Sequence, residues 1–152
     1  MMNRLFAVAC LFLAAGVLAS AQANEEKEAA FDAKCPVSGA AAKKDVTADY
    51  KEKKVHLCCD KCKAAFEKDS SKFVTRANHQ LVHTKQYKQA KCPLSGAPCK
   101  KDFAVKVSET DVYFCCNNCK GKAAGASGDD QLALIFGEEP FKKGFEVVKT
   151  DN

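Results

Sequence analysis

One cysteine pattern occurs twice in this chain and constrains its fold more than any other feature. Segment 55–63 carries Cys-Cys-x-x-Cys after a short apolar alternation, and segment 112–120 repeats it 57 residues later. In each copy another cysteine lies upstream, inside Cys-Pro-x-Ser-Gly. Segments 33–63 and 90–120 are identical at 16 of 31 positions without a gap. Such a repeat indicates two copies of one small supersecondary unit.

The same order of local elements is predicted in each copy. Proline and glycine beside a cysteine favour a tight turn, here called the cysteine knuckle. Alternating residues in 45–50 and 55–57 predict a β-hairpin around the charged turn 51–54. A helix is expected from about Asp60, with Phe66 facing the hairpin. We therefore expect an α+β chain of two tandem units of treble-clef or zinc-ribbon type, each a knuckle plus hairpin followed by a helix.

Four segments are expected along the chain. Residues 1–23 have the basic start, apolar run and small residues of a secretory signal peptide, with an uncleaved anchor as the alternative. A flexible leader at 24–32, a first unit at 33–89 and a second unit with a C-terminal extension at 90–152 follow. No later apolar run is long enough to cross a membrane, so no span is expected after cleavage. We expect a secreted or periplasmic protein.

The parts of the chain between the repeated segments are less patterned. Residues 76–91 have few apolar positions, so we expect a short element and a linker there. In the second unit a helix is predicted from Asn117, and a glycine-rich break follows it. Asp129 or Asp130 is expected to cap a further helix that Gly137 ends.

Charge and missing motifs exclude several functions. The formal net charge is +5, but lysines alternate with acidic residues and no basic block contains aromatic residues. Nucleic-acid binding is therefore not expected. We find neither a glycine-rich phosphate loop nor a Ser-His-Asp set, and no carboxylate pair stands out as an acid/base couple. We do not expect an enzyme.

The number of cysteines argues for something other than a full set of disulfides. Of ten cysteines, Cys10 belongs to the predicted signal peptide, and the remaining nine cannot all pair within one chain. Units of this size have marginal cores and usually need a further stabilising link. A structural zinc ion contributes about 10–16 kcal/mol and a disulfide about 2–4 kcal/mol. Export favours disulfides, so the choice between disulfides and metal binding depends on the cysteine spacing.

Thiolates from the knuckle, the strand end and the helix start are suited to Zn²⁺ or Cu⁺. Neighbouring cysteines seldom bind one ion, because alternation points them to opposite sides. The residues alone leave open whether one or both members of each Cys-Cys pair take part. The available thiols are Cys35, Cys58, Cys59 and Cys62 in the first unit and Cys92, Cys115, Cys116 and Cys119 in the second.

The spacing of the cysteines, together with Tyr50, Phe66 and Phe73, resembles the TRASH/YHS group of small metal-binding domains. This resemblance implies a role in heavy-metal sensing, trafficking or resistance, with a soft metal ion as ligand and a metal-trafficking or envelope protein as partner. It also implies that the metal ligands are Cys35, Cys58, Cys62, Cys92, Cys115 and Cys119. Cys59 and Cys116, which stand where that pattern usually has serine, are accessory candidates.

Two other functions remain open. A disulfide-stapled secreted scaffold for protein interaction would oxidise pairs such as Cys35–Cys62. A thiol–disulfide oxidoreductase would use the Cys-x-x-Cys pairs Cys59–Cys62 and Cys116–Cys119 at their strand-to-helix turns.

Four further side chains are weaker candidates for the site. His56 is interpreted as a strand-face residue, because tyrosine replaces it in the second copy. His79 and His83 have helical spacing but are interpreted as a solvated linker pair. Cys99 has no counterpart in the first copy, and a free thiol, a disulfide partner and an extra ligand all remain open for it.

Overall fold

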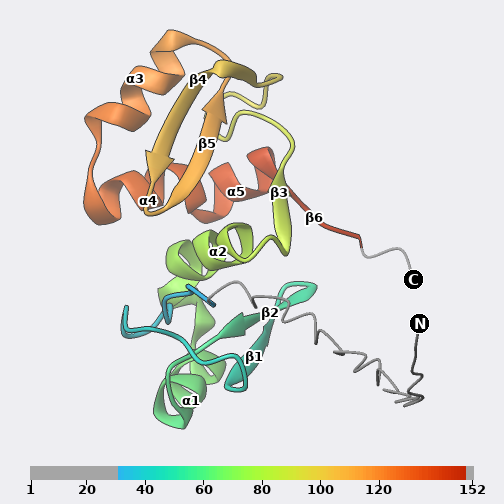
Figure 1. Cartoon of the computed structure of the whole chain (residues 1–152), viewed down its shortest axis with the longest axis vertical. Coiled ribbons are helices and arrows are strands. Elements are labelled where there is room, and N and C mark those ends of the chain that lie inside the picture. Colours follow the sequence, from blue (N-terminus) through green and yellow to red (C-terminus); the bar gives the residue numbers. More distant parts are fainter. Residues whose placement is uncertain (1–30, 150–152) are drawn as a thin grey trace, which may run out of the picture.

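The computed structural model describes residues 31–149 (Figure 1), so the predicted signal peptide at 1–23 and most of the leader at 24–32 lie outside the described residues. The described chain is mixed α+β, with short antiparallel strand pairs and five α-helices. In chain order the elements are β1 (Thr47–Tyr50), β2 (Lys53–His56), α1 (Asp60–Lys68), a 3₁₀ helix η1 (Ser70–Phe73), α2 (Val74–His83), β3 (Tyr87–Gln89), β4 (Lys100–Val107), β5 (Thr110–Phe114), α3 (Asn117–Gly125), α4 (Gly128–Phe136), α5 (Glu138–Gly144) and β6 (Phe145–Val147).

Each repeated segment folds into the predicted hairpin. Strand β1 pairs antiparallel with β2, with Thr47 opposite His56. Strand β4 pairs in the same way with β5, with Val105 opposite Val112. Every second side chain of β5 is buried, which is the pattern that a half-buried strand requires. The hairpins therefore bring the strand ends, and the cysteines after them, to the same place in both units.

A helix follows each hairpin, as predicted. Helix α1 begins at Asp60 and buries only Phe66, which packs edge-on against the Tyr50 ring. Helix α3 begins at Asn117 and buries the smaller Ala123 at the corresponding position. Gly137 ends α4 as expected, whereas Ser127 occupies its N-cap in place of the two aspartates, which lie in the first turn.

The segment expected to be largely linker contains helix α2, the central helix of the molecule. It buries two polar residues, Asn78 and Gln80, beside the apolar Ala77 and Leu81. Asn78 accepts a hydrogen bond from the Tyr50 hydroxyl (3.2 Å) and donates one to the Phe136 carbonyl (2.9 Å). The apolar residues of α2 recur at helical spacing, at Val74, Ala77 and Leu81, and the buried polar residues interrupt this stripe.

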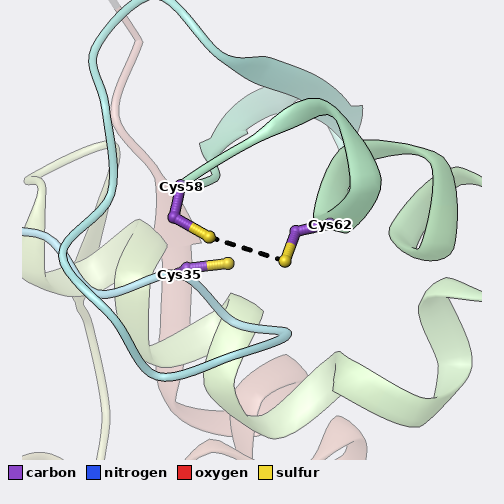
Figure 2. A group of neighbouring side chains, drawn as sticks. All are labelled: Cys35, Cys58 and Cys62. Carbon is purple, nitrogen blue, oxygen red and sulfur yellow. Dashed lines mark hydrogen bonds between the residues drawn. The ribbon is translucent and has the colours of Figure 1, made fainter.

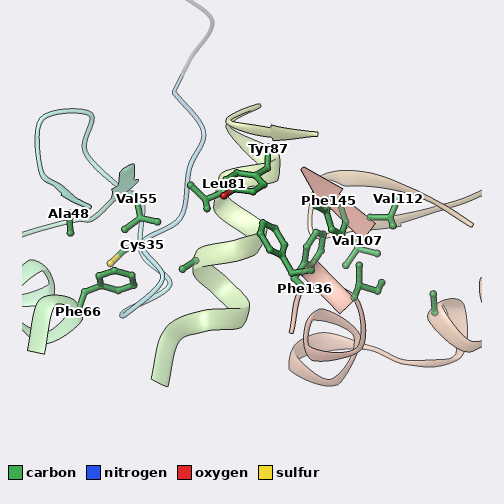
Figure 3. Packing of buried hydrophobic residues seen from close by; sticks show 14 of the residues in the cluster. Cys35, Ala48, Val55, Phe66, Leu81, Tyr87, Val107, Val112, Phe136 and Phe145 are labelled. Atoms are coloured by element: carbon green, nitrogen blue, oxygen red, sulfur yellow. The ribbon is translucent and has the colours of Figure 1, made fainter. Parts of the chain in front are cut away.

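One hydrophobic core spans both units. Figure 3 shows Leu81 of α2 between Val55 and Phe66 on one side and Phe136 and Phe145 on the other. Helix α2 packs against β2 and β3 as well as against α4 and α5. Strand β3 pairs with the distant β6, which ties the C-terminal segment to the middle of the chain. Within residues 31–149, no helix combines the length and apolarity that crossing a membrane requires.

Candidate metal centre

The cysteine knuckle is a tight turn closed by backbone hydrogen bonds. In the first unit the Cys35 N–H donates to the Ala40 carbonyl (2.7 Å), and the Gly39 N–H donates to the Cys35 carbonyl (2.8 Å). Gly39 has a φ of 75°, a left-handed conformation that glycine adopts without strain. The turn buries Cys35 to 1 % exposure. The Cys35 thiol of the knuckle therefore lies below the protein surface.

The strand end and the helix start supply two more thiols to the same point. Cys58 follows β2, and Cys62 lies in the first turn of α1. Figure 2 shows their sulfurs beside that of Cys35. The Sγ atoms of Cys58 and Cys62 are 3.5 Å apart, and all three sulfurs lie within 4.8 Å of one another. We call these three thiols the first triad.

The second unit reproduces this arrangement. The Cys92 N–H donates to the Ala97 carbonyl (2.9 Å), and Gly96 has a φ of 76°. The sulfurs of Cys92, Cys115 and Cys119 also lie within 4.8 Å of one another, and we call them the second triad. The segments that carry the two triads lie toward opposite ends of the molecule, around α1 and α3 (Figure 1). Each unit therefore has its own site.

A buried glutamine joins the ligand-bearing segments of the first unit, and the sequence alone did not reveal its role. The Gln80 Nε2 donates to the carbonyls of Lys34 (2.8 Å) and His56 (2.7 Å), and the His56 N–H donates to Gln80 Oε1 (2.7 Å). Lys34 precedes Cys35, and His56 lies two residues before Cys58. The amide therefore sets the distance between the knuckle and the strand end.

Gln89 performs the same task in the second unit. Its Nε2 donates to the carbonyls of Lys91 (3.1 Å) and Tyr113 (2.6 Å), and its Oε1 accepts from the Tyr113 N–H (2.9 Å). Lys91 and Tyr113 are the repeat counterparts of Lys34 and His56. Gln89 precedes its knuckle whereas Gln80 follows its own, so the repeat alignment cannot pair them. Gln131, which precedes a leucine as Gln80 does, donates to the Ala123 carbonyl instead (2.8 Å).

Hydrogen bonding and burial give two thiols of the first triad different pKa values. Burial opposes ionisation of Cys35, but the Ser38 hydroxyl and the surrounding backbone N–H groups outweigh it and lower its pKa to about 7. The contact with the Cys58 thiol, aided by burial, raises the pKa of Cys62 to about 12. Ser38 Oγ also lies 3.3 Å from Cys58 Sγ. One thiolate is thus ready near neutral pH, and the others lose their protons as a metal binds.

The thiol pKa values of the second triad are shifted in the same directions. Burial works against ionisation of Cys92, yet the Ser95 hydroxyl and backbone N–H groups lower its pKa to about 7. Burial and the Cys115 thiol raise the pKa of Cys119 to about 12. The Ser95 hydroxyl lies 3.1 Å from Cys115 Sγ. Each knuckle serine therefore contacts a strand-end thiol and supports a thiolate in its own turn.

The second cysteine of each vicinal pair stays outside its triad. Cys59 is exposed, and its sulfur lies 3.7 Å from that of Cys58. Cys116 is partly exposed, 3.6 Å from Cys115. The backbone N–H at the start of each following helix lowers the pKa of Cys59 and of Cys116.

The three histidines and Cys99 belong to neither triad. The His56 ring packs against Phe31, with 4.6 Å between centroids, and contacts the Lys44 carbonyl. His79 and His83 stack on one another and both contact the Thr110 hydroxyl, so the expectation of a solvated pair is wrong. Cys99 lies near the second triad, where its sulfur contacts the Tyr113 carbonyl at 3.3 Å.

Comparison with protein-family models, with curated proteins and with solved structures finds no match for this chain. The chemistry of the site is therefore argued from its own geometry. All nine cysteines within residues 31–149 are free thiols. The two triads can each hold a metal ion.

Proposed function

We propose that this chain is an exported soft-metal-binding protein that carries one ion in each of its two thiolate triads. The observation that carries the proposal is the convergence of three sulfurs within 4.8 Å at equivalent positions of both units. Both copies of the repeated unit retain the same knuckle, the same turn glycine and the same serine contact.

Three sulfurs favour a soft ion in trigonal coordination, such as Cu⁺. A structural Zn²⁺ ion takes four ligands, and each triad supplies three. The knuckle, hairpin and helix of each unit support a treble-clef-like module of the TRASH/YHS type. In this proposal the protein is not an enzyme, and a metal-trafficking or envelope protein supplies or receives the ion.

Native mass spectrometry of the protein purified anaerobically from its export compartment tests this function. We expect two metal ions per chain and fully reduced cysteines. A metal-free chain lighter by about eight hydrogens, the mass of four disulfides, would instead support the disulfide-stapled scaffold.

One observation favours a second candidate, a thiol–disulfide oxidoreductase. In the Cys59–Cys62 pair the exposed first thiol has a lowered pKa, and the less accessible second thiol has a raised pKa. Attack by an accessible thiolate is the first step of disulfide exchange. We expect no reduction of insulin disulfides by the wild-type chain. Turnover that disappears in Cys59→Ser and Cys116→Ser would establish this second function.

A further inference from the structure

The four thiols of the first unit are linked through Cys58. The Cys58 sulfur lies 3.5 Å from that of Cys62 and 3.7 Å from that of Cys59. Cys35 completes the triad with Cys58 and Cys62, whereas the sulfur of Cys59 lies outside that set. Cys58 therefore connects the inner triad to the outer thiol of Cys59.

Exposure orders these thiols from the interior to the solvent. Cys35 is buried to 1 % exposure, Cys58 and Cys62 are partly buried, and Cys59 is exposed. Cys59 occupies the N-cap of α1 in an extended conformation. Its exposed thiol is the member of the cluster that an incoming molecule meets first.

The geometry points to Cys59 as the receiving thiol of the first site, which takes a soft ion such as Cu⁺ from a donor complex and passes it to the triad. This inference rests on the proposed function, because it describes how the ion reaches the same site. Cys116, partly exposed and 3.6 Å from Cys115, has the same position in the second site.

The transfer is a ligand exchange without a redox change. One bond between the ion and its donor is replaced by a bond to the Cys59 sulfur, and the thiol proton leaves to the freed donor ligand or to water. Bonds to Cys58 and Cys62 then form as the remaining bonds to the donor break, and each thiol gives its proton to the freed donor ligand or to water. Cys35 finally replaces Cys59 at the ion, and the Cys35 proton passes to the released Cys59 thiolate. After the first bond every step is intramolecular, so the neighbouring sulfurs act at high effective concentration.

Stopped-flow transfer of Cu⁺ from its coloured bicinchoninate complex to the reduced full-length chain tests this order. We expect Cys59→Ser to slow loading of one ion per chain by about tenfold or more, with two ions still bound at saturation. Cys116→Ser is expected to slow loading of the ion at the second site. The two variants serve as controls for each other, because each leaves the cysteines of the opposite site intact.

Three results would overturn the inference, and only the third would also contradict the proposed function. A wild-type rate in Cys59→Ser would show that the ion enters elsewhere. Loss of one ion from Cys59→Ser at saturation would make Cys59 an equilibrium ligand instead of a receiving thiol. A wild-type chain that takes up no Cu⁺ would contradict the proposed function and this inference together.

Discussion

The glutamine amides illustrate how single residues set the geometry of both sites. The side chains of Gln80 and Gln89 each accept a hydrogen bond from the backbone N–H of one strand residue and donate one to the carbonyl of the same residue. The backbone of a neighbouring strand would bond in the same way. The two glutamines each cover the free edge of a short hairpin next to the triad cysteines. Gln80 is buried and Gln89 partly buried. Replacing either amide is costly, because each buried partner left without a hydrogen bond costs about 1–3 kcal/mol.

Replacement of these glutamines should affect one site at a time. We expect Gln80→Leu to weaken metal binding at the first site and spare the second, and Gln89→Leu to do the reverse. Competition with a chromophoric Cu⁺ chelator, read out ion by ion in native mass spectra, measures the effect. Gln86→Leu is the control, since Gln86 bonds the same edge farther from the cysteines, at Lys54. Equal losses at both sites in each variant would refute the assignment.

The buried histidine of α2 makes stability depend on pH. Burial, followed by the nearby His83, lowers the pKa of His79 from 6.5 to about 4. In the unfolded chain His79 therefore binds a proton near pH 6.5, whereas in the folded chain it binds one only near pH 4. This contribution is complete above pH 6.5 and is lost as the pH falls toward 4. The groups around the ring are His83, Thr110, Lys34, Glu109 and Phe136.

Urea unfolding at pH 7.5 and pH 5.0 measures this contribution. We expect the wild-type chain to lose about 2 kcal/mol of unfolding free energy between the two pH values through this residue. His79→Gln, which retains a polar group for Thr110, should reduce the loss by that amount. An unchanged pH dependence in the variant would assign the effect to other groups.

At the scale of elements, the knuckle depends on a backbone conformation. An alanine Cβ at Gly39 would meet no atom within 4 Å, so only the positive φ opposes it. We expect Gly39→Ala to destabilise the protein by about 1–2 kcal/mol and to weaken the first site. Gly121→Ala, in an equally open position within α3, should stabilise it by about 0.5–1 kcal/mol. Chemical denaturation with parallel metal titration compares them, and effects of the same sign would contradict this view of the turn.

The elements that the sequence predicted are those with strong local patterns. Alternating residues predicted β1 and β2, and the position of Asp60 predicted the start of α1. A short element and a linker were predicted over 76–91, but the length and central position of α2 were not, because its buried polar residues Asn78 and Gln80 bond to partners distant in sequence. Strands β3 and β6 have three residues each, and no local pattern links Tyr87 with Val147. The convergence of the triad sulfurs was expected, whereas the roles of Ser38 and Gln80 required the fold.

At the scale of the whole molecule, the two units share one core around α2. Phe136 is fully buried in α4, with its ring against His79 at 4.9 Å and Phe145 at 5.4 Å. Its carbonyl accepts the hydrogen bond from Asn78. Packing between the units is therefore continuous, and we expect the chain to unfold as one cooperative body.

Truncation of Phe136 tests this cooperation. We expect Phe136→Ala to lower the unfolding free energy by about 3–5 kcal/mol. Amide hydrogen exchange should accelerate by similar factors in β2 and β5, because global unfolding exposes both. Tyr113→Ala, at a side chain that is 37 % exposed, should change stability by less than about 0.5 kcal/mol. Faster exchange confined to β5 would show that the units unfold separately.

X-ray absorption at the copper edge gives the most direct test of the two-triad account. The reduced full-length chain is loaded with two equivalents of Cu⁺ and compared with a variant that carries Cys35→Ser, Cys59→Ser, Cys92→Ser and Cys116→Ser, so that two thiols remain at each site. We predict about three sulfur neighbours around each ion in the wild-type chain and about two in the variant. A coordination shell dominated by nitrogen or oxygen, or a sulfur count that the variant leaves unchanged, would contradict the account.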